Sequence, residues 1–359
     1  MIEAHGLRTS GAKTGLAGAL CLAAALAATN LQAAPIQGAG STFAAPAIQR
    51  WSRDYEALRA DGGDFVSPDW RVDYEPIGSL SGVMRLAQPE VDFAATEAPL
   101  TVEELKARGW IQFPIVMGGI VATANLAGIP SGELRLSGPV LAGIYLGEIT
   151  SWSDPTIAEM NPGLKLPDAE IAALHRADGS GSTQVFTSFL SETSPEWAEK
   201  AGSDLLIAWP VGRGQKGSGG LAALAAATPN SLAYLEYGQA LRQGLPMAAL
   251  LNQAGEFVAP GPESFRAGLD GVDWSAERGF LADTTNLAGA GAYPVAVATY
   301  AVLPQDRGAH RLRRVFDVFH IAFSQGADEA EALGYIPVPP RLVGENEAWW
   351  ASVVPPAVR

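Results

Sequence analysis

One short segment, residues 172–186, combines a charged pair with a cluster of small polar residues. It reads AALHRADGSGSTQVF and holds Arg176, Asp178 and five small residues between two apolar stretches. An Arg-x-Asp beside glycines and hydroxyl residues suits three kinds of chemistry: hydrolysis at a serine, binding of a nucleotide phosphate, or binding of a free anion. The rest of the sequence separates these three possibilities.

The pattern does not support a serine hydrolase. The nucleophile turn of such enzymes needs Gly-x-Ser-x-Gly, and the first of these positions around Ser180 is Asp178. His175 lies one residue before the Arg on an extended segment, so the two side chains point to opposite faces. The other histidines after residue 33 fall in or beside an amphipathic segment, where we expect surface or packing roles: His310 and His320.

Nucleotide and metal sites are not supported either. The segment VGRGQKGSGG, residues 211–220, lacks the order of a P-loop, and we do not expect it to link a strand to a helix. The segment GAGSTF is too short for a dinucleotide fingerprint. With four histidines and no paired ligand spacing, we expect neither a metal ion nor a cofactor.

Binding of a free anion fits a pattern that occurs three times: an apolar strand, a Gly/Ser/Thr turn, then a helix. The three segments are APIQGAGSTFAAPAIQRW, YEPIGSLSGVMRLA and AALHRADGSGSTQVF. The first turn of a helix presents unpaired N–H groups, the positive end of the helix dipole and hydroxyl donors. Ordinary capping would explain any single turn. Three of them, one with an Arg-x-Asp, favour a shared anion site.

The elements around these turns alternate between strands and helices. Apolar spacing predicts helices over 48–58, 183–190 and 310–325, the last stopping at Gly326, and strands over 71–77, 113–125, 169–174 and 293–303. Thr101 and Glu104 form a capping box, and Pro139 follows a Ser that caps another helix. This alternation predicts an α/β protein with largely parallel sheets. A chain of 359 residues is long enough for two domains.

The first residues have the parts of a secretory signal peptide. A basic start with Arg8 and Lys13 precedes the apolar run LAGALCLAAALAA, and small residues end at Ala33. We therefore expect a signal peptide over residues 1–33 and a periplasmic mature protein. The single cysteine, Cys21, lies inside this leader, and the Leu20 before it suits lipid attachment poorly, so we do not expect a lipoprotein. A mature chain without thiols is compatible with an oxidising compartment.

The negative charge of the chain argues against polyanionic partners. The formal net charge is −14, and removal of the leader makes the mature chain slightly more negative. Nucleic acid and anionic membranes attract the opposite sign, so we expect neither as a partner. An anion site in this chain must work through local donors.

Taken together, these motifs resemble the periplasmic phosphate-binding proteins of phosphate ABC transporters, the PstS family. The resemblance covers nearly all of the mature chain, in order and spacing, and is carried by GAGSTFAAP, YEPIGSLSG, VDFAATEAPL, QFPIVMGG, GEITSWSDPTIAEMNPGLKLP, RADGSGST, WPVGRGQKGSGG and AYLEY. It implies an α/β, two-lobed periplasmic binding protein of type II-like topology. The ligand cleft would lie between lobes joined by a two-segment hinge. Lobe I would comprise residues 34–120 and 293–359, and lobe II residues 121–292.

The resemblance also implies a set of phosphate-binding residues. The family's motifs match Thr42, Phe43, Ser79, Glu97, Arg176, Asp178, Ser180, Gly181 and Ser182. Two positions depart from the family: Ser182 stands where Thr is usual, which keeps the hydroxyl, and Glu97 stands where the family has Asp. An ionised carboxylate only accepts hydrogen bonds, so at this position it would favour an anion that carries a proton, phosphate, over sulfate.

The function implied is capture of inorganic phosphate in the periplasm and its delivery to the permease and ATPase subunits of an ABC importer. The protein would act as a monomer and would not be an enzyme. Two alternatives stay open: a binding protein for another oxyanion, arsenate or sulfate-like, and an extracellular enzyme or scaffold that reuses the fold.

Overall fold

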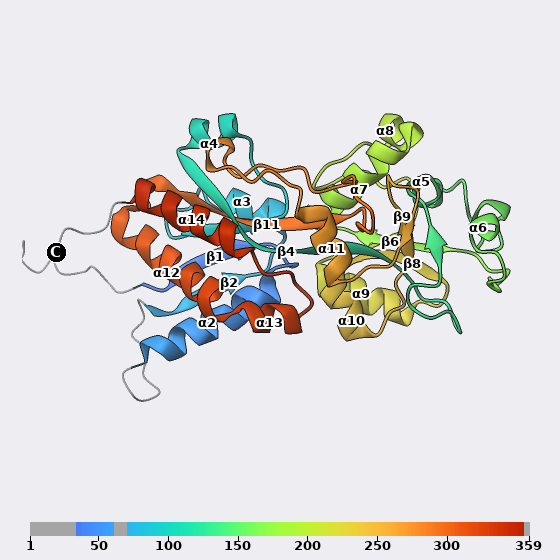
Figure 1. The fold of residues 1–359 in the computed structure, drawn as a ribbon, viewed down its shortest axis with the longest axis horizontal. Coiled ribbons are helices and arrows are strands. Elements are labelled where there is room, and N and C mark those ends of the chain that lie inside the picture. Colours follow the sequence, from blue (N-terminus) through green and yellow to red (C-terminus); the bar gives the residue numbers. More distant parts are fainter. Residues whose placement is uncertain (1–33, 61–69, 355–359) are drawn as a thin grey trace, which may run out of the picture.

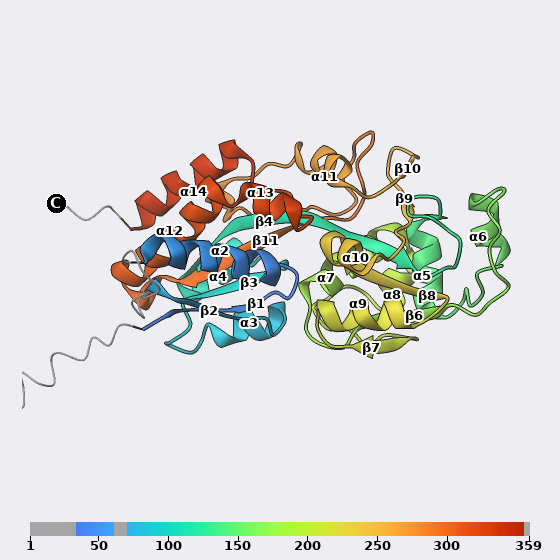
Figure 2. The same cartoon turned by 90° about the horizontal axis from the view of Figure 1, so that it is seen from below.

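The computed structural model describes residues 34–60 and 70–354. The leader predicted over residues 1–33, with Cys21, lies outside the described residues. The elements gather into two lobes (Figure 1), and Figure 2 shows β4 and β11 at the junction between them. The first lobe contains β1–β3, α2–α4 and α12–α14. The second contains β5–β10 and α5–α10.

The strands form one large sheet that continues through both lobes and one small sheet in the second lobe. The large sheet has the order β2-β1-β3-β11-β4-β8-β6-β7, and the small one β10-β9-β5. The strands are β1 (Ile36–Gly40), β2 (Val72–Glu75), β3 (Phe93–Thr96), β4 (Trp110–Ala124), β5 (Arg135–Leu136), β6 (Ala172–Arg176), β7 (Arg213–Gln215), β8 (Ser231–Glu236), β9 (Ala249–Leu251), β10 (Phe257–Val258) and β11 (Ala296–Pro304).

The helices pack on both faces of the large sheet. In the first lobe α12 packs on α2 and β1, and in the second lobe α9 packs on β6 and β8. The described helices are α2 (Ala45–Arg59), α3 (Ser79–Arg85), α4 (Val102–Arg108), α5 (Gly138–Leu146), α6 (Pro155–Met160), α7 (Gly181–Thr193), α8 (Pro195–Lys200), α9 (Ser218–Ala227), α10 (Tyr237–Gln243), α11 (Pro262–Leu269), α12 (Ala309–Gln325), α13 (Ala327–Ala332) and α14 (Pro340–Val353), with 3-10 turns η2 (Ala276–Arg278) and η3 (Gln305–Arg307).

Local sequence signals account for several of these boundaries. Thr101 and Glu104 form the expected capping box at the start of α4. The side chain of Ser137 caps α5, with Pro139 in the first turn, and α12 ends at Gly326. These devices satisfy main-chain groups that a helix leaves unpaired at its ends. Within the described ranges no helix has the length and apolar character needed to cross a membrane.

The strand directions differ between the ends and the middle of the large sheet. β1 is parallel to both β2 and β3, and β6 is parallel to both β7 and β8. β11 is antiparallel to β3 and β4, and β4 is antiparallel to β8. The prediction of largely parallel sheets therefore holds for each lobe but is wrong for the strands between them. Because carboxyl ends of parallel strands share one sheet edge, each lobe presents its strand-to-helix turns along a single edge.

β4 changes its partner in the middle of its length. It pairs with β11 as far as Gly119 and with β8 from Ile120 onward. This change lies where the resemblance implies the first crossing between the lobes. The division of the chain at residues 120/121 and 292/293 stays a prediction.

One expectation about a connection is wrong. The segment 211–220 does link a strand to a helix, because β7 ends at Gln215 and α9 begins at Ser218. Gly217 precedes the helix with φ +70°, a conformation that favours glycine. The chain thus has a fourth turn of the kind seen three times in the sequence.

Candidate functional site

A buried arginine at the end of β6 forms the centre of the site. Arg176 is 2 % exposed, and its guanidinium donates from Nε to Oδ1 of Asp178 at 2.7 Å and from Nη2 to Oδ2 at 2.5 Å. The two-residue spacing lets the carboxylate hold the fork from one side, which leaves Nη1 directed elsewhere. Gly217 N–H also donates to Oδ1 of Asp178 at 3.1 Å. Asp178, one of the binding residues expected from the sequence, is therefore in direct contact with the arginine.

The charges of this pair support each other. Burial by itself lowers the pKa of Arg176, but the hydrogen bonds that Arg176 donates to Asp178 and the negative charge of Glu236 outweigh burial and hold this pKa above its ordinary value. Burial raises the pKa of Asp178, and the hydrogen bonds and charge of Arg176 reverse this and keep it below its ordinary value. Both groups are therefore charged at neutral pH.

A second buried carboxylate lies beside the arginine. Glu236, at the end of β8, is 4 % exposed. Its Oε1 accepts from the hydroxyls of Ser182 at 2.8 Å and Ser218 at 2.6 Å and lies 3.9 Å from Nη1 of Arg176. Nη1 itself donates to the Ser218 hydroxyl at 3.2 Å.

The first lobe supplies a third carboxylate, Glu97, directly after β3. It is 4 % exposed and accepts from the hydroxyls of Ser41, of Ser79 at 2.8 Å and of Thr299 at 3.0 Å. Burial raises the pKa of Glu97 although these three hydrogen bonds oppose the shift, and the charge of Glu236 raises it further. Glu97 is therefore an interior group and not a surface acid.

Hydrogen bonds join the two lobes across this site. The Thr42 and Ser218 hydroxyls lie 2.6 Å apart, and Ser218 N–H donates to Thr42 Oγ1 at 3.2 Å. Gly181 N–H donates to the Ser79 hydroxyl at 3.1 Å, and Leu80 N–H to the carbonyl of Gly179 at 3.3 Å. The lobes are thus closed on each other at the turns that precede their helices.

Helix starts from both lobes meet at these contacts. α2 begins just after Thr42 and Phe43, α7 begins after Ser180, and α9 begins at Ser218 (Figure 2). The Ser180 hydroxyl caps α7 by accepting from Thr183 N–H at 3.3 Å, which uses a lone pair and not its proton. The carbonyl of Phe43 accepts from the Tyr335 hydroxyl at 2.5 Å. These helix ends bring N–H groups and positive dipole ends toward one buried region.

All the residues expected from the sequence lie in or beside this region, from both lobes. They are Thr42, Phe43, Ser79, Glu97, Arg176, Asp178, Ser180, Gly181 and Ser182. Four further polar residues belong to the same network and were not anticipated: Ser41, Ser218, Glu236 and Thr299. We call these thirteen residues the clamp. Ser218 carried a usable signal, the fourth strand–glycine–helix turn, and Glu236 lies in the family segment AYLEY, whereas Thr299 lies on a strand with no local motif.

The histidine of the opening segment is directed away from the clamp. His175 stacks on Trp209, with ring centroids 4.8 Å apart, and burial lowers its pKa. This placement agrees with the alternation of side chains along a strand. The described part of the chain contains no group of three or more metal-ligating side chains suited to an ion.

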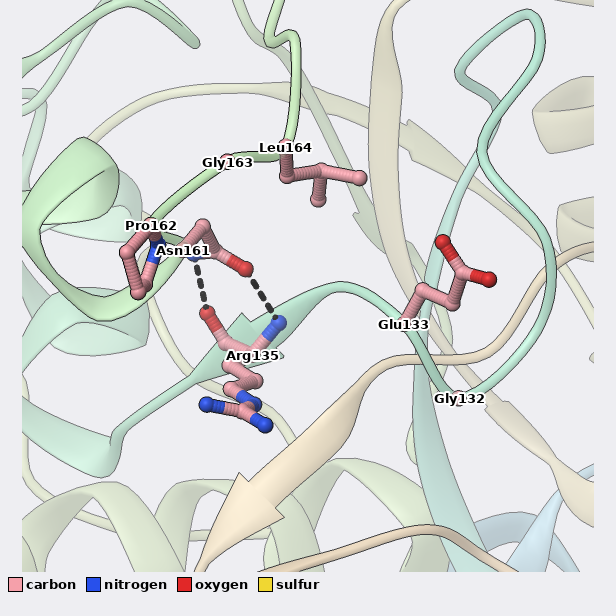
Figure 3. Close-up of a pocket in the computed structure, with 7 residues that line it drawn as sticks. All are labelled: Gly132, Glu133, Arg135, Asn161, Pro162, Gly163 and Leu164. Atoms are coloured by element: carbon pink, nitrogen blue, oxygen red, sulfur yellow. Dashed lines mark hydrogen bonds between the residues drawn. The ribbon is translucent and has the colours of Figure 1, made fainter.

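A separate hollow lies in the second lobe, next to the small sheet. It has a volume of about 380 Å³ and is lined by Gly132, Glu133, Arg135, Asn161, Pro162, Gly163 and Leu164 (Figure 3). Asn161 accepts from Arg135 N–H at 2.8 Å and donates to its carbonyl at 2.9 Å, so its amide serves the backbone. The hollow shares no lining residue with the clamp.

Known proteins resemble this chain over most of its length. Residues 23–321 match the model of the PBP superfamily domain. The phosphate-binding protein PstS of Xylella fastidiosa is 39 % identical over 326 residues, which cover 90 % of this chain and 87 % of the relative. The protein of the same name from Pasteurella multocida is 38 % identical, covering 91 % and 93 %.

Solved structures share the fold at lower identity. A high-affinity periplasmic phosphate-binding protein solved with phosphate at pH 8.5 has a TM-score of 0.65 and 20 % identity, covering 88 % of this chain and 93 % of its own. The phosphate-binding protein from Stenotrophomonas maltophilia has a TM-score of 0.64 and 18 % identity, covering 88 % and 94 %. The two-lobed α/β architecture is thus that of periplasmic binding proteins. With the full-length similarity to the PstS relatives, it follows that this chain belongs to the PBP superfamily and, within it, to the PstS family of phosphate-binding proteins.

Proposed function

We propose that this protein binds inorganic phosphate between its two lobes and delivers it to the permease and ATPase subunits of an ABC importer. The observation that carries the proposal is the buried Arg176, held on one side by Asp178 and surrounded by hydroxyls and helix starts from both lobes. An oxyanion that has lost its water needs such donors on every oxygen. The binding residues proposed are Thr42, Phe43, Ser79, Glu97, Arg176, Asp178, Ser180, Gly181 and Ser182.

Local donors also account for anion binding by an acidic protein. The formal net charge is −14, so the long-range field opposes an approaching anion. Inside a closed cleft of low dielectric, one guanidinium and several oriented N–H and O–H groups act at short range with little screening. The proposal therefore needs no positive surface.

Glu97 provides the selectivity in this proposal. A carboxylate and a phosphate can hold one proton between them, in a short hydrogen bond. Sulfate near neutral pH has no proton to contribute, so an ionised Glu97 would face it as an unpaired acceptor, at a cost of about 1–3 kcal/mol or more in a buried site. Arsenate has the same protonation chemistry as phosphate, and we expect it to compete.

The cellular setting follows from the same proposal. A signal peptide over residues 1–33 would direct the chain to the periplasm, without lipid attachment at Cys21. The protein would work there as a monomer and change no covalent bond of its ligand.

Equilibrium dialysis with labelled phosphate tests the binding function. We expect retention of one phosphate per chain at micromolar concentration, full recovery of unchanged phosphate, displacement by arsenate and no displacement by equimolar sulfate. The absence of saturable retention would contradict the proposal. Conversion of the ligand into another compound would favour an enzyme that reuses the fold, and tighter binding of sulfate would favour a protein for another oxyanion.

A further inference from the structure

Glu236 is the one carboxylate in the clamp that lies outside the set of binding residues expected from the sequence. It is 4 % exposed, and its Oε2 is buried without a hydrogen-bond partner among the residues that the structure describes. Its Oε1 accepts from two serine hydroxyls, those of Ser182 and Ser218. Both serines begin helices of the second lobe, α7 and α9, at the point where the lobes meet.

The number of protons decides what these serines can offer to a ligand. A hydroxyl carries one proton, and an ionised carboxylate only accepts. Ser182 and Ser218 therefore each donate their single hydroxyl proton to Glu236. Ser218 Oγ accepts in turn from Arg176 Nη1 at 3.2 Å. Thr42 Oγ1 lies 2.6 Å from it and accepts from Ser218 N–H, so its own proton is directed to the Ser218 oxygen. The hydroxyls of this row thus point toward Glu236.

This row of hydroxyls reduces the number of hydrogen-bond donors that the cleft offers to a ligand. While Glu236 is ionised, neither Ser182 nor Ser218 can donate a hydrogen bond to the cleft. Both lone pairs of Ser218 are already used by Arg176 and Thr42, so Ser182 offers only acceptor lone pairs and Ser218 offers nothing. An oxyanion with a proton can use such acceptors. A fully deprotonated oxyanion places its oxygens against hydroxyl oxygens that do not donate to it. It gains these donors only if the hydroxyl protons leave the buried charge of Glu236, which is costly.

We propose that Glu236 is a specificity-determining residue, which excludes proton-free oxyanions by withdrawing the Ser182 and Ser218 hydroxyls as donors. The inference rests on the proposed function of the cleft and assigns the rejection of sulfate to two carboxylates, one at the end of a strand in each lobe. Glu97 would accept a hydrogen bond from the proton of the ligand. Glu236 would act indirectly, because it holds the hydroxyl protons of Ser182 and Ser218.

The variant Glu236→Gln separates this role from a simple charge effect. In alkaline buffer both phosphate and sulfate are dianions, so the loss of one negative charge strengthens binding of both by the same factor. The amide oxygen of a glutamine at position 236 can accept from both serines, but it is neutral and holds their protons more weakly than an ionised carboxylate does, so a charged ligand can draw a hydroxyl proton into the cleft. Regaining one donor to a charged ligand corresponds to roughly tenfold in affinity. We therefore expect the phosphate-to-sulfate affinity ratio to fall about tenfold or more.

The measurement is competition of sulfate against labelled phosphate, and Glu192→Gln is the matched control. Glu192 lies on α7 and accepts at 2.7 Å from the hydroxyl of Thr285, which is not a clamp residue. This control removes an equal charge from α7, the helix that also carries Ser182, and releases no clamp donor, so its ratio should equal that of the wild type. Thermal melting of each ligand-free variant reports whether it is folded.

A second variant tests the route through the serine. In Glu236→Gln/Ser182→Ala the released hydroxyl is absent, so the gain in sulfate competition should shrink. An unchanged ratio in Glu236→Gln, or the same change in Glu192→Gln, would overturn the inference while retained phosphate binding left the proposed function intact. Failure of the wild type to retain phosphate would instead remove the proposed function, on which the inference depends.

Discussion

Gly181 of the second lobe lies directly against Glu97 of the first. A Cβ added at position 181 would come within 2.7 Å of Cβ of Glu97 and 2.9 Å of its main-chain nitrogen, and closer still to Oε2. The same glycine donates its N–H to the Ser79 hydroxyl, which in turn donates to Glu97. The absence of a side chain at this helix start lets the two lobes approach, and the predictions below follow from contacts of this kind.

Substitution Gly181→Ala should weaken phosphate binding without unfolding either lobe. Crowding of this size costs about 1–3 kcal/mol, which is roughly a 5- to 150-fold loss of affinity. Isothermal calorimetry measures the affinity, and melting without ligand checks the fold. Gly219→Ala is the control, because a Cβ there would meet its nearest neighbour at 3.9 Å. Equal affinities for the two variants would show that closure does not need the glycine.

Substitution Arg176→Lys should reduce phosphate affinity although it preserves the charge. Arg176 binds both oxygens of Asp178 through Nε and Nη2 and still directs Nη1 toward the cleft. A lysine has a single ammonium nitrogen and cannot make all of these contacts at once. The expected loss is roughly tenfold to hundredfold, the value of one or two charge-assisted hydrogen bonds. Arg213→Lys on the adjacent strand β7 is the control, since that exposed arginine bonds Thr228. An unaltered affinity in Arg176→Lys would remove the fork from the mechanism.

The stability of the ligand-free protein should depend on pH through Glu97. Burial raises the pKa of Glu97 above its ordinary value of 4.5, against the effect of its hydroxyl donors. Between the ordinary and the raised value, the folded protein holds a proton that the unfolded chain has lost. The free energy of unfolding therefore falls as the pH rises through this window.

The variant Glu97→Gln removes this loss. The free energy of unfolding of Glu97→Gln, relative to that of the wild type, should increase as the pH is raised from about 4 to about 8, as measured by urea titration. The exposed Glu133→Gln should keep a constant difference from the wild type. A gap between Glu97→Gln and the wild type that stays the same at every pH would contradict the assignment.

Substitution Gly238→Ala should hold the lobes apart on another side of their interface. Gly238 is the second residue of α10 in the second lobe, and an added Cβ would collide with the carbonyl oxygen of Leu333, which follows α13 in the first lobe. Arg242 donates to the same carbonyl at 3.0 Å. With saturating phosphate, the radius of gyration from small-angle scattering should exceed that of the wild type, and the affinity should fall by roughly tenfold.

The control for this closure contact is Gly344→Ala, at a position on α14 where a Cβ would have open space around it. Scattering profiles of Gly238→Ala that match both the control and the wild type would mean that this backbone contact does not limit closure.

The sequence by itself determined the local parts of the site. Each turn between a strand and a helix is written in consecutive residues, because an apolar strand, a glycine and a hydroxyl cap follow one another along the chain. The contact between Arg176 and Asp178 follows from a spacing of two residues. The family motifs covered the mature chain in order, and the curated relatives confirm that resemblance over 90 % of its length.

Tertiary structure alone decided which distant residues complete the clamp. Thr299 reaches Glu97 because β11 pairs antiparallel with β3, with Tyr300 opposite Thr96. Ser218 joins because β7 pairs with β6, with Gln215 opposite Arg176. Glu236 ends β8, which lies parallel to β6 on its other side. The order and register of the strands depend on pairing between segments far apart in the chain. The apolar pattern within one strand shows which face is buried but not which strand lies next to it.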